Sequence, residues 1–374
     1  MVPGDIGAEI ARLLRAGAAA GEWSTEAAGL AVTGTWRPAL PDVASGSPGY
    51  ATSLPLSLAR LSQGPAASVA EALAGGLAAL PWISTARVTG DGYLTITVTA
   101  DYLATLAPRI VAAGRAAADS DALAGRRLSA PVRPDLSAAM TWEQAWHGTC
   151  DAVTGLLARA AGAQLDFHDA EQDLARSSSA QAGCGERAAS ASVSSPVGDA
   201  VAFYGADVVG YALARASGPS GSTIARQLGL PLDLNNPFVI VTYAHADAAS
   251  TLRWAADLEL PARKEPCRTA AAAPGGGLMR PELALLNAMS WLPERVAAAA
   301  RRRRPAEVAA HLEYIGRAWL DFRETCPVLP FQGSAAPGPA ERSHGAFRLC
   351  LADAVRVTLS TGLRLLGIGA PDRL

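Results

Sequence analysis

Arginine side chains are the residues of this 374-residue chain best suited to bind a charged ligand. Lys264 is the only lysine among 32 basic residues, so chemistry that requires a lysine ammonium would have to use it. Four arginines follow one another at Arg301–Arg304, at the end of an expected helix. Such a run can bind phosphate groups, and it can equally complement the negative end of the helix dipole. The sequence leaves both interpretations open.

Cysteine and histidine residues show no metal-binding pattern. Five cysteines and five histidines are scattered along the chain, and no Cys-x-x-Cys pair occurs. Zinc sites and disulfide frameworks both depend on characteristic spacings of these residues. We therefore expect no metal ion, no disulfide framework and no cofactor.

The overall charge and hydropathy restrict the possible partners. A net charge of −2 argues against a surface coated in positive charge for indiscriminate nucleic-acid binding, but it permits a local basic face. No apolar run reaches the ~18 residues that a membrane-spanning helix needs. Residues 1–14 lack the pattern of a secretory signal. We expect cytoplasmic localisation and no membrane partner.

The first 115 residues are predicted to form an α+β module. A stripe of Ile6, Ile10, Leu13 and Leu14 predicts a helix over residues 3–22. Residues 93–98 alternate in hydropathy after the turn-forming Gly90-Asp91-Gly92, which predicts a strand. Two helical patterns precede that strand, over residues 50–61 and 68–80.

The remainder of the chain reads as helices. Residues 116–204 contain one expected helix, 142–161, and a small-residue segment, 177–195, that predicts a loop or linker. From residue 205 onward, successive amphipathic segments predict an all-α bundle. A second expected loop lies at 261–277.

The last helix, over residues 349–366, has the most regular pattern in the chain. Its apolar stripe consists of Leu351, Val355, Leu359, Leu363 and Leu366. Gly367 followed by Ile368 predicts a left-handed cap with its hydrophobic contact, and Pro371 prevents the helix from resuming. A helix with so well defined an end serves either as structural support or as a contact surface.

The helical half resembles the anticodon-binding bundle of arginyl-tRNA synthetases. Residues 235–255, NNPFVIVTYAHADAASTLRWA, are similar to the family pattern Asn-Pro followed by Tyr-Ala-His-Ala-Arg. DAVR at 353–356 stands where the family has Asp-Ala-Leu-Arg, the motif that names the DALR domain. Further similar segments, in the family's order, are 205–217, 282–300, 308–329 and 351–374.

The N-terminal segments 49–61 and 88–99 also resemble the additional N-terminal domain of these synthetases, which contacts the tRNA elbow. The resemblance implies three domains. They are an additional N-terminal domain over residues 1–115, a linker with a truncated remnant of the catalytic Rossmann core over 116–204, and a DALR-like anticodon-binding helical bundle over 205–374.

The resemblance implies tRNA contacts on the anticodon side. These fall on Tyr243, His245, Arg253, Arg356, Arg364, Asp372 and Leu374. We expect Tyr243 and His245 to share a helix face, the tyrosine stacking on an unpaired base; core roles for both stay open. The arginines could contact phosphates or form ion pairs on a solvated face. Asp247 replaces a family arginine, so we expect the contact there to be lost or altered.

On the elbow side, the resemblance implies tRNA contacts at Tyr50, Tyr93 and Thr95. Tyr93 matches the aromatic residue of the family's D-loop reader. Thr95 and Ser53 both stand where the family has asparagine. The amide groups that would read a base edge are therefore absent, which puts specific recognition at the elbow in doubt.

The motifs of synthetase catalysis are missing. Residues 148–162 resemble the helix that follows the HIGH motif, but no His-x-Gly-His precedes them and His147 stands alone. Lys264 lies beyond any KMSKS-like position. Only 42 residues, 163–204, separate this helix from residue 205, too few for a nucleotide-binding core when one βαβ unit needs ~30. We therefore expect no catalytic residue and no enzymatic activity.

Three functions remain under consideration. The first is a non-catalytic tRNA-binding paralogue, similar to the ArgS-related anticodon-binding proteins of high-GC actinobacteria, with an arginine-acceptor tRNA as the suspected partner. The second is a protein-interaction or regulatory subunit that has lost RNA binding. The third is a residual arginine–tRNA ligase. Salt-dependent tRNA binding would distinguish the first from the second.

Overall fold

The computed structural model describes residues 1–21, 24, 26, 36–39, 46–62, 65–138, 140–168, 196–260, 277–330 and 339–373. Lys264, the expected linker at 177–195 and nearly all of the expected loop at 261–277 lie outside them. The chain divides into two compact units. Unit 1 comprises Met1–Ala117, Asp247–Glu294 and Arg317–Thr358, and unit 2 comprises Ala118–Ala246, Arg295–Gly316 and Leu359–Leu374. Each unit combines segments that are distant in sequence.

A four-stranded antiparallel sheet forms the centre of the N-terminal part of unit 1. Its strands β1 (Trp36–Ala39), β2 (Gly49–Thr52), β3 (Ile83–Thr89) and β4 (Tyr93–Val98) lie in the order β1-β2-β4-β3. The predicted strand over 93–98 is confirmed. The prediction of a helix starting at residue 50 is wrong for its first residues, because these form β2, which pairs with β4.

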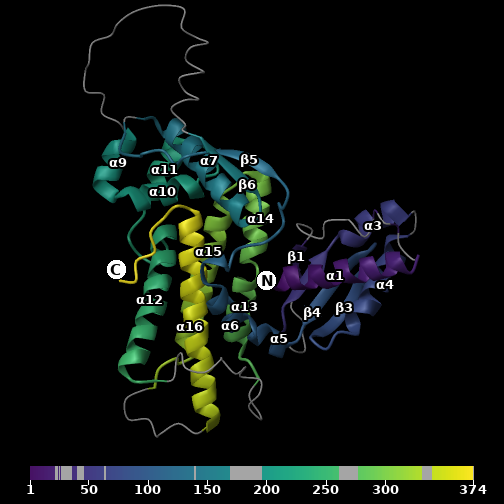
Figure 1. The fold of residues 1–374 in the computed structure, drawn as a ribbon. Coiled ribbons are helices and arrows are strands. Elements are labelled where there is room, and N and C mark those ends of the chain that lie inside the picture. Colours follow the sequence, from purple (N-terminus) through teal and green to yellow (C-terminus); the bar gives the residue numbers. More distant parts are fainter. Residues whose placement is uncertain are drawn as a thin grey trace, which may run out of the picture. The chain divides into compact units, whose positions relative to one another are not determined.

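Helices cover one face of this sheet. They are α1 (Val2–Ala19), α3 (Leu54–Ser62) and α4 (Ala66–Ala78), with α3 and α4 against the strands and α1 against α4 (Figure 1). Leu94, Ile96 and Val98 alternate along β4 and are fully buried on the covered side. The predicted N-terminal helix is confirmed; Ile6, Ile10 and Leu14 of its stripe are fully buried, whereas Leu13 is only half-buried.

The sheet is followed in unit 1 by helices α5 (Ala100–Ala104) and α6 (Leu106–Ala113) and a 3-10 turn, Gly114–Ala116. Helix α13 (Arg280–Ser290) packs on α5 and α6. Its Glu282 is fully buried and accepts hydrogen bonds from Arg348 Nε at 2.9 Å and from the Met279 N–H at 2.8 Å, with His344 Nε2 2.8 Å away. Burial by itself raises the pKa of Glu282, but these hydrogen bonds outweigh it and the pKa is lowered.

Unit 2 begins with a single parallel β–α–β unit. Strands β5 (Arg127–Pro131) and β6 (Gln164–His168) pair in parallel, and α7 (Trp142–Ala160) connects them. A Cβ on Gly155 would lie 2.4 Å from the Cβ of Ala130, so only glycine lets α7 approach β5 this closely. The helix expected over 142–161 is confirmed. Its descent from a catalytic core remains a prediction.

The next helices of unit 2 are α9 (Pro196–Tyr204), α10 (Ala206–Arg215) and α11 (Gly221–Leu228), followed later in the chain by α14 (Leu292–Arg302). Helices α9, α10 and α11 share an apolar core with α7, whose buried members include Leu136, Ala145, Val209, Leu213 and Ile224. Glu313 on α15 (Ala306–Thr325) accepts a hydrogen bond from Arg215 Nε at 2.6 Å, which ties α15 to α10.

Three long helices contribute residues to both units: α12 (Pro237–Asp257), α15 and α16 (Pro339–Leu365). Among the described residues from 205 onward, every regular element is a helix, as predicted. Helix α16 begins ten residues before the predicted start. It ends as predicted: Gly367 has φ +73°, and the N–H of Ile368 donates to Leu363 O at 2.9 Å. All five stripe residues of the final helix are fully buried.

Candidate nucleic-acid interface

The residues implied by the family resemblance are divided between the two units. Tyr50, Tyr93, Thr95, Arg253 and Arg356 belong to unit 1. Tyr243, His245, Arg364 and Asp372 belong to unit 2, and Leu374 lies outside the described residues.

The side of the β1–β4 sheet opposite α3 and α4 carries polar and aromatic side chains. Tyr93 and Thr95 point to this side because they alternate with the buried Leu94 and Ile96. Thr95 Oγ1 lies 3.0 Å from Thr89 Oγ1, and the Tyr93 side chain is 45% exposed.

Two arginines that the sequence analysis did not single out lie on the same side. Arg87 is the direct partner of Thr95 across β3–β4. Arg37 is the partner of Ala51 across β1–β2, and Ala51 pairs with Thr95 in turn. Both arginines are exposed, and neither forms an ion pair with another described residue. We call Arg37, Arg87, Tyr93 and Thr95 the open sheet face. The hairpin turn at 90–92 sets the register of Arg87, so that residue could have been found from sequence.

Tyr50 does not belong to this face, and its prediction as a tRNA contact is wrong. Its partner across β2–β4 is Ile96, which places the ring on the covered side, where it is fully buried. The ring stacks on Trp291 with centroids 5.3 Å apart, and its hydroxyl lies 3.2 Å from Ser290 Oγ. This burial raises the pKa of Tyr50. Tyr50 is a core residue of unit 1.

The two candidate arginines on helices of unit 1, Arg253 and Arg356, have partners within their own helices. Arg356 Nη2 lies 2.6 Å from Asp353 Oδ1, one turn earlier in α16, so the alternative of an intrahelical ion pair is confirmed. Arg253 donates to Ser250 Oγ on α12. Neither partner prevents a phosphate contact, because both side chains remain partly exposed.

The side chain of Asp247 is hydrogen-bonded to neighbouring side chains of unit 1. Its carboxylate accepts hydrogen bonds from Trp319 Nε1 at 2.9 Å and from Arg323 Nε at 3.2 Å. The Arg323 guanidinium also lies over the Trp319 ring, 5.7 Å from its centroid. Asp247 therefore joins α12 to α15, and its charge is compensated within unit 1.

In unit 2, Tyr243 and His245 lie on different faces of α12, so the expectation of a shared face is wrong. Two residues advance an α-helix by about 200°. Tyr243 is 41% exposed, whereas His245 is 1% exposed. The alternative of a core role is confirmed for His245 alone.

His245 holds the C-terminal tail of the chain. Its Nδ1 lies 3.0 Å from the carbonyl oxygen of Pro371, and as an N–H it donates to that oxygen. Its Nε2 lies 4.0 Å from Asp372 Oδ1. We call His245, Pro371, Asp372 and the neighbouring exposed Tyr243 the tail site; the first three join α12 to the tail.

Two further side chains of unit 2 fix the tail. Arg133 donates to the carbonyl oxygen of Gly367, and the N–H of Gly369 donates to Asp207 Oδ2 at 3.1 Å. Burial lowers the pKa of Arg133, and the nearby Asp207 carboxylate opposes that shift. The tail therefore has a defined course up to Asp372. Sequence periodicity gave no signal for these contacts.

Arg364, on the last turn of α16, is exposed in unit 2. Its charge lies near Asp119, where burial raises the carboxyl pKa and Arg364 lowers it. Asp372 is also exposed, at 67% of its side chain. Both residues are accessible to a ligand.

The part of the chain that the structure describes contains neither a cluster of metal-ligating side chains nor a membrane-spanning helix. No three His, Cys, Asp or Glu side chains there come together in a way that could hold a metal ion. Within the same ranges, every helix is too short or too polar to cross a bilayer.

A comparison with protein families finds a match over the last third of the chain. Residues 241–374 match the DALR anticodon binding domain. This region contains most of α12, all of α13–α16 and the tail site. The last third of the chain is therefore similar to a DALR anticodon binding domain.

Curated relatives extend the similarity. The arginine–tRNA ligase of Frankia alni is 38% identical over 177 residues, which are 47% of this chain and 30% of that protein. The arginine–tRNA ligase of Micrococcus luteus is 33% identical over 177 residues, with the same shares. The matched part of the chain therefore spans about a third of the length of these relatives.

A solved structure shows the same fold. The arginyl-tRNA synthetase of Thermus thermophilus superposes with a TM-score of 0.55 at 14% identity, covering 100% of this chain and 100% of that chain. At this identity the likeness concerns the fold alone. It agrees with an N-terminal α/β region and a helical C-terminal domain.

These relatives contradict the expectation that the chain is not an enzyme. The relatives from Frankia alni, Micrococcus luteus and Paenarthrobacter aurescens are all named arginine–tRNA ligase. The expectation relied on the absence of HIGH-like and KMSKS-like motifs. These motifs were sought outside the region that the relatives share with this chain, so the shared region does not support that expectation.

Proposed function

We propose that this protein binds tRNA through its DALR-like domain, with an arginine-acceptor tRNA as the ligand. The match of residues 241–374 to the DALR anticodon binding domain carries the proposal. The relatives' name, arginine–tRNA ligase, supports the choice of tRNA. The three predicted domains, 1–115, 116–204 and 205–374, form part of the proposal.

Tyr243 is the proposed base contact in unit 2. Its exposed ring lies on α12, and an exposed aromatic ring can stack on an unpaired base. Arg364 and Asp372 are exposed on the elements that end the chain, and Arg364 supplies positive charge for a phosphate. His245 acts indirectly in this proposal, as the positioning residue that keeps the tail against α12.

Unit 1 offers the second contact. On the open sheet face, Arg37 and Arg87 can bind phosphates, and the Tyr93 ring can stack on a base. Thr95 lies between the two arginines in the strand register and supplies one hydroxyl. Arg253 and Arg356 are proposed as further phosphate contacts of this unit.

A fluorescence titration of the full chain with labelled tRNA, at two salt concentrations, tests the proposal. We expect tighter binding of an arginine-acceptor transcript than of an unrelated tRNA, weakening as salt rises. Tyr243→Ala should weaken binding about tenfold or more, the range measured for base–aromatic stacking. Tyr314→Ala is the matched control, since Tyr314 is an exposed tyrosine of the same unit that is not among the candidates.

Equal effects of both substitutions would exclude a specific role for Tyr243. Absence of tRNA binding by the unmodified chain at either salt concentration would exclude the proposed function itself.

A second candidate is protein binding by unit 2. Leu232 and Phe203 are 79% and 81% exposed, and Leu230 and Leu234 near the start of α12 are also exposed. The three leucines lie within five residues of one another, and exposed apolar side chains that are grouped together are typical of interaction surfaces. Association with another protein that does not change with salt would support this candidate over RNA binding.

The names of the relatives favour a third candidate, ligation of arginine to tRNA. Incubating the chain with tRNA, ATP and labelled arginine measures this activity directly. Acid-precipitable label above that of a protein-free control would establish it.

A further inference from the structure

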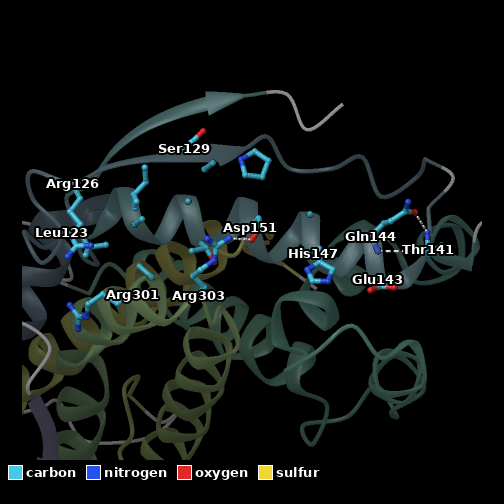
Figure 2. Close-up of a pocket in the computed structure, with 18 residues that line it drawn as sticks. Leu123, Arg126, Ser129, Thr141, Glu143, Gln144, His147, Asp151, Arg301 and Arg303 are labelled. Carbon is cyan, nitrogen blue, oxygen red and sulfur yellow. Dashed lines mark hydrogen bonds and ion pairs between the residues drawn. The ribbon is translucent and has the colours of Figure 1, made fainter. Parts of the chain in front are cut away.

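A cavity of about 1100 Å³ lies in unit 2, away from the tail site, along one side of α7 (Figure 2). Strand β5 and the end of α14 form its other walls. Small and apolar residues account for much of its lining, among them Leu128, Ala130, Gly148, Gly155, Ala158 and Ala300. The lining on α7 runs from Glu143 to Ala158, about 22 Å of helix. The cavity is thus an elongated groove with an apolar floor.

The charges of the groove are unevenly distributed. Figure 2 shows Arg126 and Arg301 at one end, and Thr141, Glu143 and Gln144 at the other. Within the described part of the chain, the guanidinium groups of Arg126 and Arg301 have neither an ion pair nor a hydrogen bond. Two arginines facing one groove repel each other, and a bound anion removes that repulsion.

Arg303 adds a third guanidinium to the groove and neutralises its nearest carboxylate. Its Nη2 lies 2.6 Å from Asp151 Oδ1 on α7 (Figure 2). With this pair formed, Asp151 does not oppose an anion at the Arg126 and Arg301 end. Glu143 and His147 are the other ionisable groups of the lining, and they lie toward the opposite end.

The backbone at Arg303 is strained. Its φ is +54°, in the left-handed region, and it ends α14 in the position that glycine usually occupies. The N–H of Arg304 donates to Ala299 O at 2.9 Å, which completes the cap. A glycine would form this cap without strain, so the arginine at 303 is explained by its side chain. Strained residues of this kind are concentrated at functional sites.

We propose that this groove binds the phosphate group of a nucleotide, with Arg126 and Arg301 as its ligands. Guanidinium groups bind phosphate oxygens through paired, charge-assisted hydrogen bonds. The small, apolar floor accommodates the base and sugar, and the length of the groove admits more than one nucleotide. The phosphate can belong to a free nucleotide or to a single RNA strand. The proposal is independent of the tail site and of the open sheet face.

Isothermal titration calorimetry of the full chain tests the proposal with three probes: uridine, uridine 5′-monophosphate and a tetrauridylate strand. We expect uridine to bind at least tenfold more weakly than its monophosphate, since it lacks the group that the arginines hold. Tighter binding of the tetrauridylate would identify an RNA strand as the source of the phosphate. Equal or weaker binding of the tetrauridylate would identify a free nucleotide.

Substitutions then locate the site. Arg126→Gln and Arg301→Gln should each weaken monophosphate binding about tenfold or more. Arg304→Gln is the matched control, because Arg304 is exposed in the same run but does not line the groove, and it should bind as the unmodified chain does. Equal binding of uridine and its monophosphate, or equal loss in all three variants, would overturn the proposal.

Arg303→Gly separates binding from stability. It removes the backbone strain, so we expect an unchanged or higher melting temperature, together with weaker monophosphate binding because Asp151 regains an uncompensated charge. A lower melting temperature with unchanged binding would overturn the role given to Arg303. Loss of tRNA binding in Tyr243→Ala with intact monophosphate binding would show that the two sites are separate. Groove variants that alter neither ligand would overturn this inference and leave the proposed function intact.

Discussion

The open sheet face of unit 1 and the tail site of unit 2 present candidate RNA contacts in opposite ways. Arg37, Arg87 and Tyr93 point into solvent because strand alternation directs every second side chain away from the helices. In the tail site, by contrast, the motif residue His245 is buried and hydrogen-bonded to the backbone of the tail. The polar side chains of the open sheet face are accessible to a ligand, whereas His245 of the tail site holds the tail in place.

This difference shows that a motif residue need not be accessible to a ligand. The tyrosine and the histidine of the segment Tyr243-Ala-His-Ala stand two positions apart and have different environments. Substitutions of buried and exposed members of each surface should therefore separate stability from binding.

The largest effect is expected at Tyr50, on the covered side of the sheet. Tyr50→Ala should lower the free energy of unfolding by about 3–5 kcal/mol, as for other buried aromatic residues. Tyr50→Phe keeps the ring and should cost about 1 kcal/mol, the net value of one hydrogen bond. Urea unfolding measures both. Weaker tRNA binding by Tyr50→Phe, at unchanged stability, would instead return Tyr50 to the RNA contacts.

His245→Ala should have the next largest effect. The free energy of unfolding should fall by about 1–3 kcal/mol, because the Pro371 carbonyl loses its hydrogen bond and the missing imidazole leaves a cavity. Hydrogen exchange should rise in the tail, residues 366–373, more than in α10. Unchanged protection of the tail would show that Arg133 and Asp207 hold it without His245.

The arginines of the open sheet face should affect binding without affecting stability. Arg37→Gln and Arg87→Gln should each reduce the slope of log affinity for tRNA against log salt by about 0.7–0.9, the contribution of one phosphate contact. Their unfolding free energies should stay within about 0.5 kcal/mol of the unmodified chain. Arg60→Gln, on the helix α3 that covers the other side, is the control. An equal change of slope in the control would mean a nonspecific charge effect.

The smallest effect is expected for Asp372→Asn. The carboxylate is mostly exposed and lies 4.0 Å from the His245 ring, a geometry in which ion pairs contribute about 0–1 kcal/mol. Thermal unfolding should therefore barely change, in contrast to His245→Ala. A loss as large as that of His245→Ala would place the tail's stability in the side-chain pair rather than in the Pro371 carbonyl.

Local pattern alone determined several elements of this protein. The stripe of Ile6, Ile10 and Leu14, the alternation over 93–98 and the glycine cap at Gly367 all depend on neighbours within a few residues along the chain. Helix and strand periods and left-handed backbone preferences are properties of such short segments. The segments that resemble the DALR bundle likewise lie in consecutive helices.

The tertiary structure alone decided which side chains are buried and what they contact. Alternation shows that Tyr50 and Thr52 share a side of β2, but only the placement of α3 and α4 makes that the covered side. Asp247 acquires its partners from α15, and Arg303 contacts Asp151 on a helix about 150 residues earlier in the chain. Burial depends on the elements that pack from elsewhere in the chain, and no period within one segment records them.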